Sequence, residues 1–80
     1  MKVRITVSLR PGVLDPAAAT IQRSLGQLGF AGVTSLVQRR VFELEIAQDD
    51  REAVLAEARE MADRLLANPV IETFTVDLVE

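Results

Sequence analysis

Apolar and polar residues alternate along three segments of the chain, which is the pattern of a β-strand with one buried face. In the first segment, residues 2–9, the apolar positions are Val3, Ile5, Val7 and Leu9. The other two segments have theirs at Phe42, Leu44 and Ile46, and at Phe74, Val76 and Leu78. Residues 33–38 predict a fourth strand, joined to the strand at 42–46 by a tight hairpin near Arg39 and Arg40.

Apolar residues at helical spacing predict two helices between these strands. Asp15 offers a cap for the first helix and Pro16 suits its first turn, so we expect a helix over residues 16–28 that ends before Gly29. Its buried stripe is predicted at Ala18, Ile21, Leu25 and Leu28. The second helix is expected to begin at the caps Asp49 and Asp50 and to end at Asn68-Pro69, with a core stripe of Val54, Ala58, Met61, Ala62 and Leu65.

The resulting order is β-α-β-β-α-β, so we predict an α+β two-layer sandwich related to the ferredoxin-like fold. Its sheet is expected to be antiparallel, with two helices on one face. A chain of 80 residues has room for one thin core, so residues 1–80 are expected to form a single domain.

The composition excludes several classes of function. The chain has no His, Cys or Tyr and a single lysine, Lys2, so the side chains most often used as base or nucleophile near neutral pH are missing. We therefore assign no catalytic residue, metal ligand or cofactor to it. A net charge of −3 with scattered basic residues argues against nucleic acid, and no apolar run is long enough to span a bilayer. Together with the lack of cysteine, this predicts a cytoplasmic protein.

Two acidic residues of the third predicted strand, Glu43 and Glu45, project from the same face because they lie two positions apart. Such a pair can hold a cation. The simpler interpretation is a solvent-facing pair or an ion-pair partner for a basic strand residue such as Arg4, and we favour it.

The segment Arg10-Pro11-Gly12 lies where the first strand turns toward a helix N-terminus, where free backbone N–H groups can hold an anion. No phosphate-binding glycine motif is present, and Asp15 competes for the same donors as the helix cap. A structural turn is therefore the favoured interpretation.

Charge is nearly absent from residues 16–38, where Arg23 is the only charged residue. The side of the first predicted helix opposite Ile21 and Leu25 carries Arg23 and otherwise small or neutral residues, namely Ala19, Gln22, Gly26 and Gln27. Because interface cores are depleted in charge, this side is either a protein contact surface or an ordinary solvent-exposed helix face.

Two segments carry a family resemblance: Leu9-Arg10-Pro11-Gly12-Val13-Leu14-Asp15-Pro16 and Leu65-Leu66-Ala67-Asn68-Pro69-Val70-Ile71-Glu72. Together with Ser24-Leu25-Gly26-Gln27-Leu28-Gly29-Phe30 between them, they resemble the PurS family over the whole chain. Arg10 stands at the lysine position of that family. Where the family has an R-x-G-K hairpin, this chain has Val37-Gln38-Arg39-Arg40, which leaves the role of that hairpin open.

The resemblance implies a small subunit of phosphoribosylformylglycinamidine (FGAM) synthase that carries no active site and self-associates as a homodimer or higher oligomer. Its implied partners are PurQ, a glutaminase that releases ammonia, and PurL, a synthetase that uses ATP and magnesium. The subunit would bridge them and help transfer ammonia. The resemblance implies a functional loop at Arg10, Pro11, Gly12, Asp15 and Pro16, and a turn fixed by Asn68 and Pro69.

Two alternatives share features with this sequence. Arg10 and Asn68 are compatible with a small acylphosphatase-like hydrolase, which has the same order of elements. An ACT-like module that binds an amino acid at a dimer interface is the other alternative.

Overall fold

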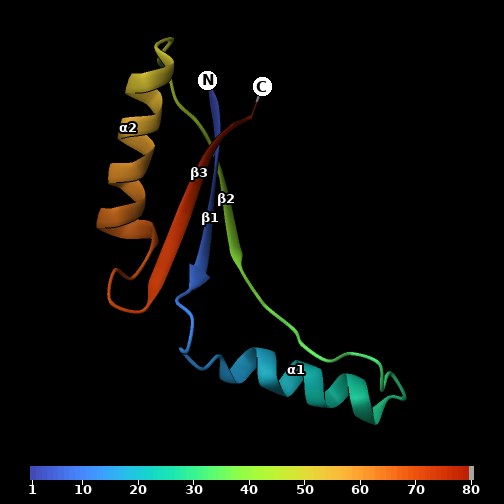
Figure 1. Ribbon diagram of the computed structural model, residues 1–80. Coiled ribbons are helices and arrows are strands. Elements are labelled where there is room, and N and C mark those ends of the chain that lie inside the picture. The colour runs from blue at the N-terminus through green and yellow to red at the C-terminus, as the bar shows by residue number, and fades with distance from the viewer. Residues whose placement is uncertain (80) are drawn as a thin grey trace.

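The computed structural model describes residues 1–79, and its centre is a three-stranded antiparallel sheet (Figure 1). The strands are β1 (Lys2–Leu9), β2 (Arg40–Glu45) and β3 (Glu72–Val79), in the spatial order β2-β1-β3. The register pairs Ile5 of β1 with Phe42 on one side and with Val76 on the other. The three segments of alternating residues are therefore confirmed as strands.

The core lies between one face of the sheet and helix α2 (Arg51–Met61). Val3, Ile5 and Val7 are fully buried on the sheet side, and Val54 and Ala58 are fully buried on the helix side. Asp50 caps α2 as expected, because its Oδ1 accepts a hydrogen bond from the Glu52 N–H at 3.1 Å. The other sheet face is mainly polar, with Val41 exposed on it, so the predicted one-sided burial holds.

The last turn of the second helix is a π-helical segment, η1 (Ala62–Leu66), in which the Ala67 N–H bonds the Ala62 carbonyl at 2.8 Å. A π-helical turn holds an extra residue and rotates the side chains that follow. The prediction of Leu65 in the core is therefore wrong: its side chain is 82% exposed, and Leu66 packs against the core instead.

Helix α1 (Pro16–Gln27) has nearly the predicted bounds. Asp15 Oδ1 accepts the Ala18 N–H at 3.1 Å, which confirms the cap, and Gly29 takes the left-handed conformation with φ of 102°. A Phe30 N–H to Leu25 carbonyl bond of 2.9 Å closes the end of the helix.

The position of α1 differs from the prediction, because α1 lies beyond the end of the sheet rather than on its face (Figure 1). Residues 10–15 lead the chain away from the core, and the described molecule is 49 Å long but 14 Å thick. Of the predicted stripe only Ala18 is buried, while Ile21 is 42% and Leu28 is 73% exposed. A helix without a sheet beneath it cannot bury such a stripe.

Residues 33–38 form no strand, and the hairpin at Arg39 and Arg40 is likewise absent from the described chain. The segment returns from the end of α1 as an extended chain, and the side-chain amide of Gln22 donates to the Val33 carbonyl at 3.3 Å. Because it runs beside a helix and not beside a strand, it has no ladder of backbone partners. The fold is still α+β with an antiparallel sheet, as predicted.

Within residues 1–79, no helix combines the length and the apolar character needed to cross a membrane.

Candidate functional site

The loop after β1 is built around Arg10 and Gly12. The Val13 N–H bonds the Arg10 carbonyl at 3.1 Å, and Gly12 has φ of 87°, a conformation that favours glycine. Pro16 then stands in the first turn of α1 next to the Asp15 cap. The segment is thus a structural turn that redirects the chain into α1.

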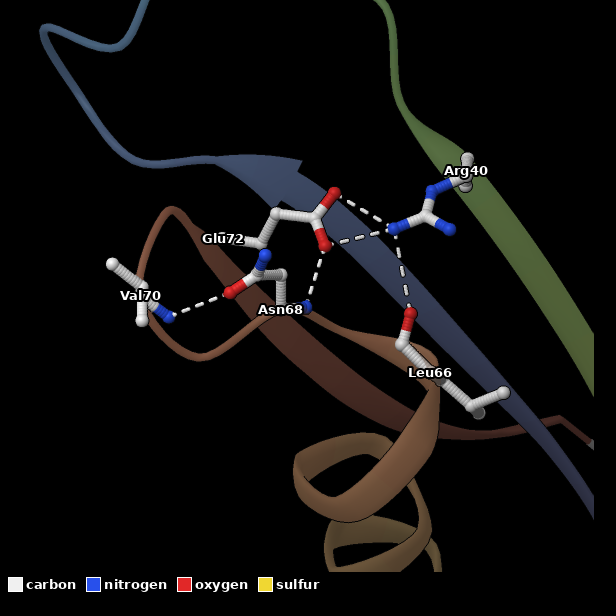
Figure 2. A network of polar contacts seen from close by, with 5 residues as sticks. All are labelled: Arg40, Leu66, Asn68, Val70 and Glu72. Atoms are coloured by element: carbon white, nitrogen blue, oxygen red, sulfur yellow. Dashed lines mark hydrogen bonds and ion pairs between the residues drawn. The ribbon is translucent and has the colours of Figure 1, made fainter.

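The turn before β3 is organised by Asn68 (Figure 2). Its Oδ1 accepts the Val70 N–H at 3.0 Å, and its carbonyl accepts the Glu72 N–H at 2.8 Å. Its own N–H donates to Glu72 Oε1 at 2.6 Å. Asparagine is suited to such a turn because its short side chain can bond the backbone two residues ahead.

Arg40 connects this turn to the far strand of the sheet (Figure 2). Its Nη2 donates to both carboxylate oxygens of Glu72, at 2.8 and 2.7 Å, and to the Leu66 carbonyl at 3.4 Å. Arg40 belongs to β2 and Glu72 to β3, so the pair spans the central strand. It ties the start of both outer strands to the end of η1.

The hydrogen bond from the Asn68 N–H is the main cause that lowers the pKa of Glu72 below its ordinary value of 4.5, and Arg40 adds to the effect. Partial burial of the carboxylate opposes them but does not outweigh them. Glu72 therefore stays ionised at neutral pH and acts as a fixed acceptor.

The structure brings the two predicted loops together. The Arg10 Nη2 donates to the Pro69 carbonyl at 3.0 Å, and the Arg10 N–H donates to the Ile71 carbonyl at 2.9 Å. Arg10 of the first predicted loop thereby lies next to Pro69 of the second. Because Arg10 bonds a backbone carbonyl, these contacts favour the structural interpretation of Arg10 over an anion site.

An open hollow of about 390 Å³ lies beside these loops, with Leu14 and Ile71 among its lining residues. Arg39 also borders it and donates through Nε to the Ser8 hydroxyl at 2.9 Å. Its lining combines apolar side chains with the guanidinium groups of Arg39 and Arg40 and the carboxylates of Asp15 and Glu72. Among the described residues there is no cluster of acidic side chains arranged to hold a metal ion.

The remaining predicted residues, Ala19, Arg23 and Gly26, lie along α1 away from these loops, and all are exposed. A Cβ placed on Gly26 would meet nothing within 4 Å. On the open sheet face, Glu43 accepts two hydrogen bonds from Arg4, at 2.9 and 3.1 Å, as the ion-pair interpretation predicted.

Sequence reasoning missed the Arg40–Glu72 pair. The two residues are 32 positions apart, and each belongs to a segment whose charge pattern resembles ordinary surface. Nothing local indicates their contact, since it depends on the order of the strands.

Comparison with known proteins identifies the chain. The family model "PurS: Phosphoribosylformylglycinamidine (FGAM) synthase" matches residues 2–80. The PurS subunit from Synechocystis sp. is 40% identical over 75 residues, which are 94% of this chain and 75% of the relative. The PurS subunit from Methanocaldococcus jannaschii is 36% identical over 94% of this chain and 90% of its own length.

Solved structures agree with these relatives. The crystal structure of Methanocaldococcus jannaschii PurS, a subunit of formylglycinamide ribonucleotide amidotransferase in the purine biosynthetic pathway, superposes with a TM-score of 0.85 at 37% identity. That match covers 99% of this chain and 98% of the other. A chain of the PurLQS structure from Thermotoga maritima has a TM-score of 0.89 at 29% identity, over 98% and 95% of the two chains. The chain therefore belongs to the PurS family of phosphoribosylformylglycinamidine synthase subunits, which act in purine biosynthesis.

Proposed function

We propose that this chain is a non-catalytic assembly subunit of FGAM synthase. It associates with itself, binds a PurL-like synthetase and a PurQ-like glutaminase, and assists the transfer of ammonia between them. ATP and magnesium belong to the synthetase partner. The similarity to a chain of the Thermotoga maritima PurLQS structure supports this assignment of partners.

The observation that carries the proposal is the uncovered apolar side of α1. The helix has 12 residues, and isolated helices of that length are marginal in water. Ile21 and Leu28 remain exposed, and so does Phe30 just beyond the helix. A second protein surface would bury these side chains and stabilise the helix.

The apolar face of β2 is only partly covered. Helix α2 packs against β1 and β3, while Phe42 and Leu44 on the same face of β2 are only partly buried. In a two-layer sandwich a second helix would lie there. An α1 helix from another copy of the chain fits this position, so a homodimer is the assembly that we propose.

The side-chain inventory supports a role without catalysis. The chain lacks His and Cys, and Arg10, Arg40 and Glu72 are occupied by contacts within the chain. Such residues are better suited to assembly than to covalent chemistry.

Self-association is tested by sedimentation of two charge-introducing variants, Ile21→Glu on the apolar side of α1 and Gly26→Glu on its neutral side. Gly26→Ala is the matched control, because it strengthens the helix by up to about 1 kcal/mol without adding charge. We expect the Ile21 variant to dissociate and to keep its circular dichroism spectrum at the sheet wavelengths. Normal assembly of both glutamate variants would refute a contact through α1.

The role in ammonia transfer is tested by reconstitution with PurL-like and PurQ-like subunits from the same organism. Glutamine-dependent FGAM synthesis should require this chain, whereas synthesis from added ammonium salt should depend on it much less. The isolated chain should hydrolyse neither glutamine, ATP nor acyl phosphates. Hydrolysis of any of these substrates by a rigorously pure sample of the chain would overturn the proposal. So would FGAM synthesis that depends on the chain equally with glutamine and with ammonium salt.

A further inference from the structure

Helix α1 is joined to the rest of the chain by two stems. Residues 10–15 lead from β1 to the helix, and residues 28–39 return from it to β2. We call residues 10–39 the arm. Within residues 1–79 no other helix or strand packs extensively against α1, which lies beyond the end of the sheet (Figure 1). The direction of the arm is therefore set by contacts at its stems and not by packing along the helix.

The outgoing stem is tied to the turn before β3 by Arg10. Its guanidinium Nη2 donates to the Pro69 carbonyl at 3.0 Å, and its backbone N–H donates to the Ile71 carbonyl at 2.9 Å. That turn is itself held by the hydrogen bonds of Asn68. Arg10 thus anchors the outgoing stem to an ordered part of the chain.

The returning stem is tied to β1 by Arg39. Its Nε donates to the Ser8 hydroxyl at 2.9 Å. The next residue, Arg40, is the first of β2 and lies opposite Val7 in the sheet, so this tie lies where the arm meets the sheet. Each stem therefore carries one arginine whose side chain bonds a partner outside the arm. We call Arg10 and Arg39 the arginine clamp.

Little else holds the two stems in place. The outgoing stem contains Gly12 in the left-handed conformation with φ of 87°, and the returning stem has no strand beside it. An open hollow of about 360 Å³ lies between the stems, and both arginines of the clamp line it. No packed core therefore replaces the clamp at the base of the arm.

Two carboxylates lie near the arginine clamp, and each has another donor. Asp15 lines the same hollow as the clamp, and its Oδ1 accepts the Ala18 N–H. Glu72 borders the neighbouring hollow and accepts from Arg40. The clamp itself bonds neutral carbonyl and hydroxyl oxygens. Such bonds weaken when the donor moves out of line, so they fix the orientation of the stems.

We propose that Arg10 and Arg39 set the direction of the arm and thereby present α1 to the β2 face of a second copy. The inference rests on the proposed function, because it concerns the helix through which the chain self-associates. An arm that is already oriented loses little conformational freedom on association, so more of its contact energy contributes to affinity. Loss of the clamp widens the range of arm orientations and weakens self-association, while the sheet stays intact.

The first measurement reports the spread of arm orientations in the full chain. Because the sequence has no cysteine, Gln27→Cys in α1 and Glu57→Cys in α2 add two unique positions for a donor and an acceptor dye. Both positions are exposed. Single-molecule fluorescence energy transfer at picomolar concentration, where the chain is monomeric, gives the distribution of distances between the helices through the donor lifetime.

Three double variants are compared with the unaltered chain. Arg10→Ala with Arg39→Ala removes both side-chain contacts of the clamp. Arg10→Lys with Arg39→Lys is the conservative variant, since lysine keeps a charged donor at each position. Arg51→Ala with Arg59→Ala is the matched control, because it removes the same charge from two exposed positions of α2. Sedimentation of each unlabelled form measures self-association, and hydrogen exchange of the amides in β1 measures the integrity of the sheet.

We expect the alanine pair at the clamp to broaden the distance distribution and to weaken self-association about fivefold or more, since hydrogen bonds from charged groups contribute at least that much. The lysine pair and the α2 control should keep the narrow distribution. Protection of the Ile5 and Val7 amides should be equal in all forms.

A distance distribution equally wide in the alanine pair and in the α2 control would overturn the inference. Loss of β1 protection in the alanine pair would assign the two arginines to the stability of the whole fold and overturn it as well. If the alanine pair broadens the distribution but no form self-associates, the proposed homodimer fails, whereas the role of the clamp in orienting the arm stands.

Discussion

Loss of the cap at Asp15 should loosen α1 and leave the sheet intact. Asp15→Ala removes the acceptor of the Ala18 N–H. It also removes the only charge between residues 11 and 22, a negative charge that stabilises the helix N-terminus. Caps of this kind contribute about 0.5–2 kcal/mol, and the added charge places Asp15 in the upper half of that range. A loss of about 1–2 kcal/mol raises the population of the open helix roughly 5- to 30-fold.

Amide hydrogen exchange measures this effect residue by residue. Protection of the α1 amides should fall by that factor in Asp15→Ala, while the Ile5 and Val7 amides in the central strand change little. Asp15→Asn is the matched control, since it keeps the oxygen acceptor and should retain most of the protection. Unchanged α1 protection would show that the cap does not hold the helix. An equal loss of protection at the sheet amides would show that α1 and the sheet open together, contrary to their separation in the structure.

The other predictions concern the core and the turn. Val54→Ala removes two buried methyl groups and should lower the free energy of unfolding by about 2 kcal/mol, measured by urea unfolding. An unchanged free energy of unfolding would contradict the burial of Val54 in the core. Leu65→Ser should leave the urea midpoint nearly unchanged and Leu66→Ser should lower it, and the reverse order would refute the π-helical turn. Because its pKa is lowered on folding, Glu72 should stabilise the chain fully above pH 4.5 and lose this contribution as the pH falls. The difference in unfolding midpoint between the unaltered chain and Glu72→Gln should therefore shrink in acid, and a difference independent of pH would exclude this role.

The strands could be predicted because each has one buried face. Alternation at Val3, Ile5 and Val7 reports burial directly, and the structure places those side chains under α2. The caps at Asp15 and Asp50 were equally accessible to sequence reasoning, since a cap acts within three residues of itself.

The position of α1 could not be predicted from its pattern. An apolar stripe indicates that a helix packs against something, but it does not say whether that surface belongs to the same chain. The β-branched composition of residues 33–38 was misleading for a related reason, because strand propensity reflects packing on a pleated surface and these residues have no neighbouring strand. Both errors concern contacts that depend on what lies beside the segment.

The candidate site shows the same division between local and distant causes. The bonds that Asn68 makes to Val70 and Glu72 lie within four residues, so its role in the turn was foreseeable. The exposure of Leu65 was not, because the hydrogen bonds of η1 span five residues rather than four, which rotates the side chains and exchanges Leu65 for Leu66 in the core. The Ala67 N–H to Ala62 carbonyl bond thus has two consequences, since it packs Leu66 against the core and leaves Leu65 exposed.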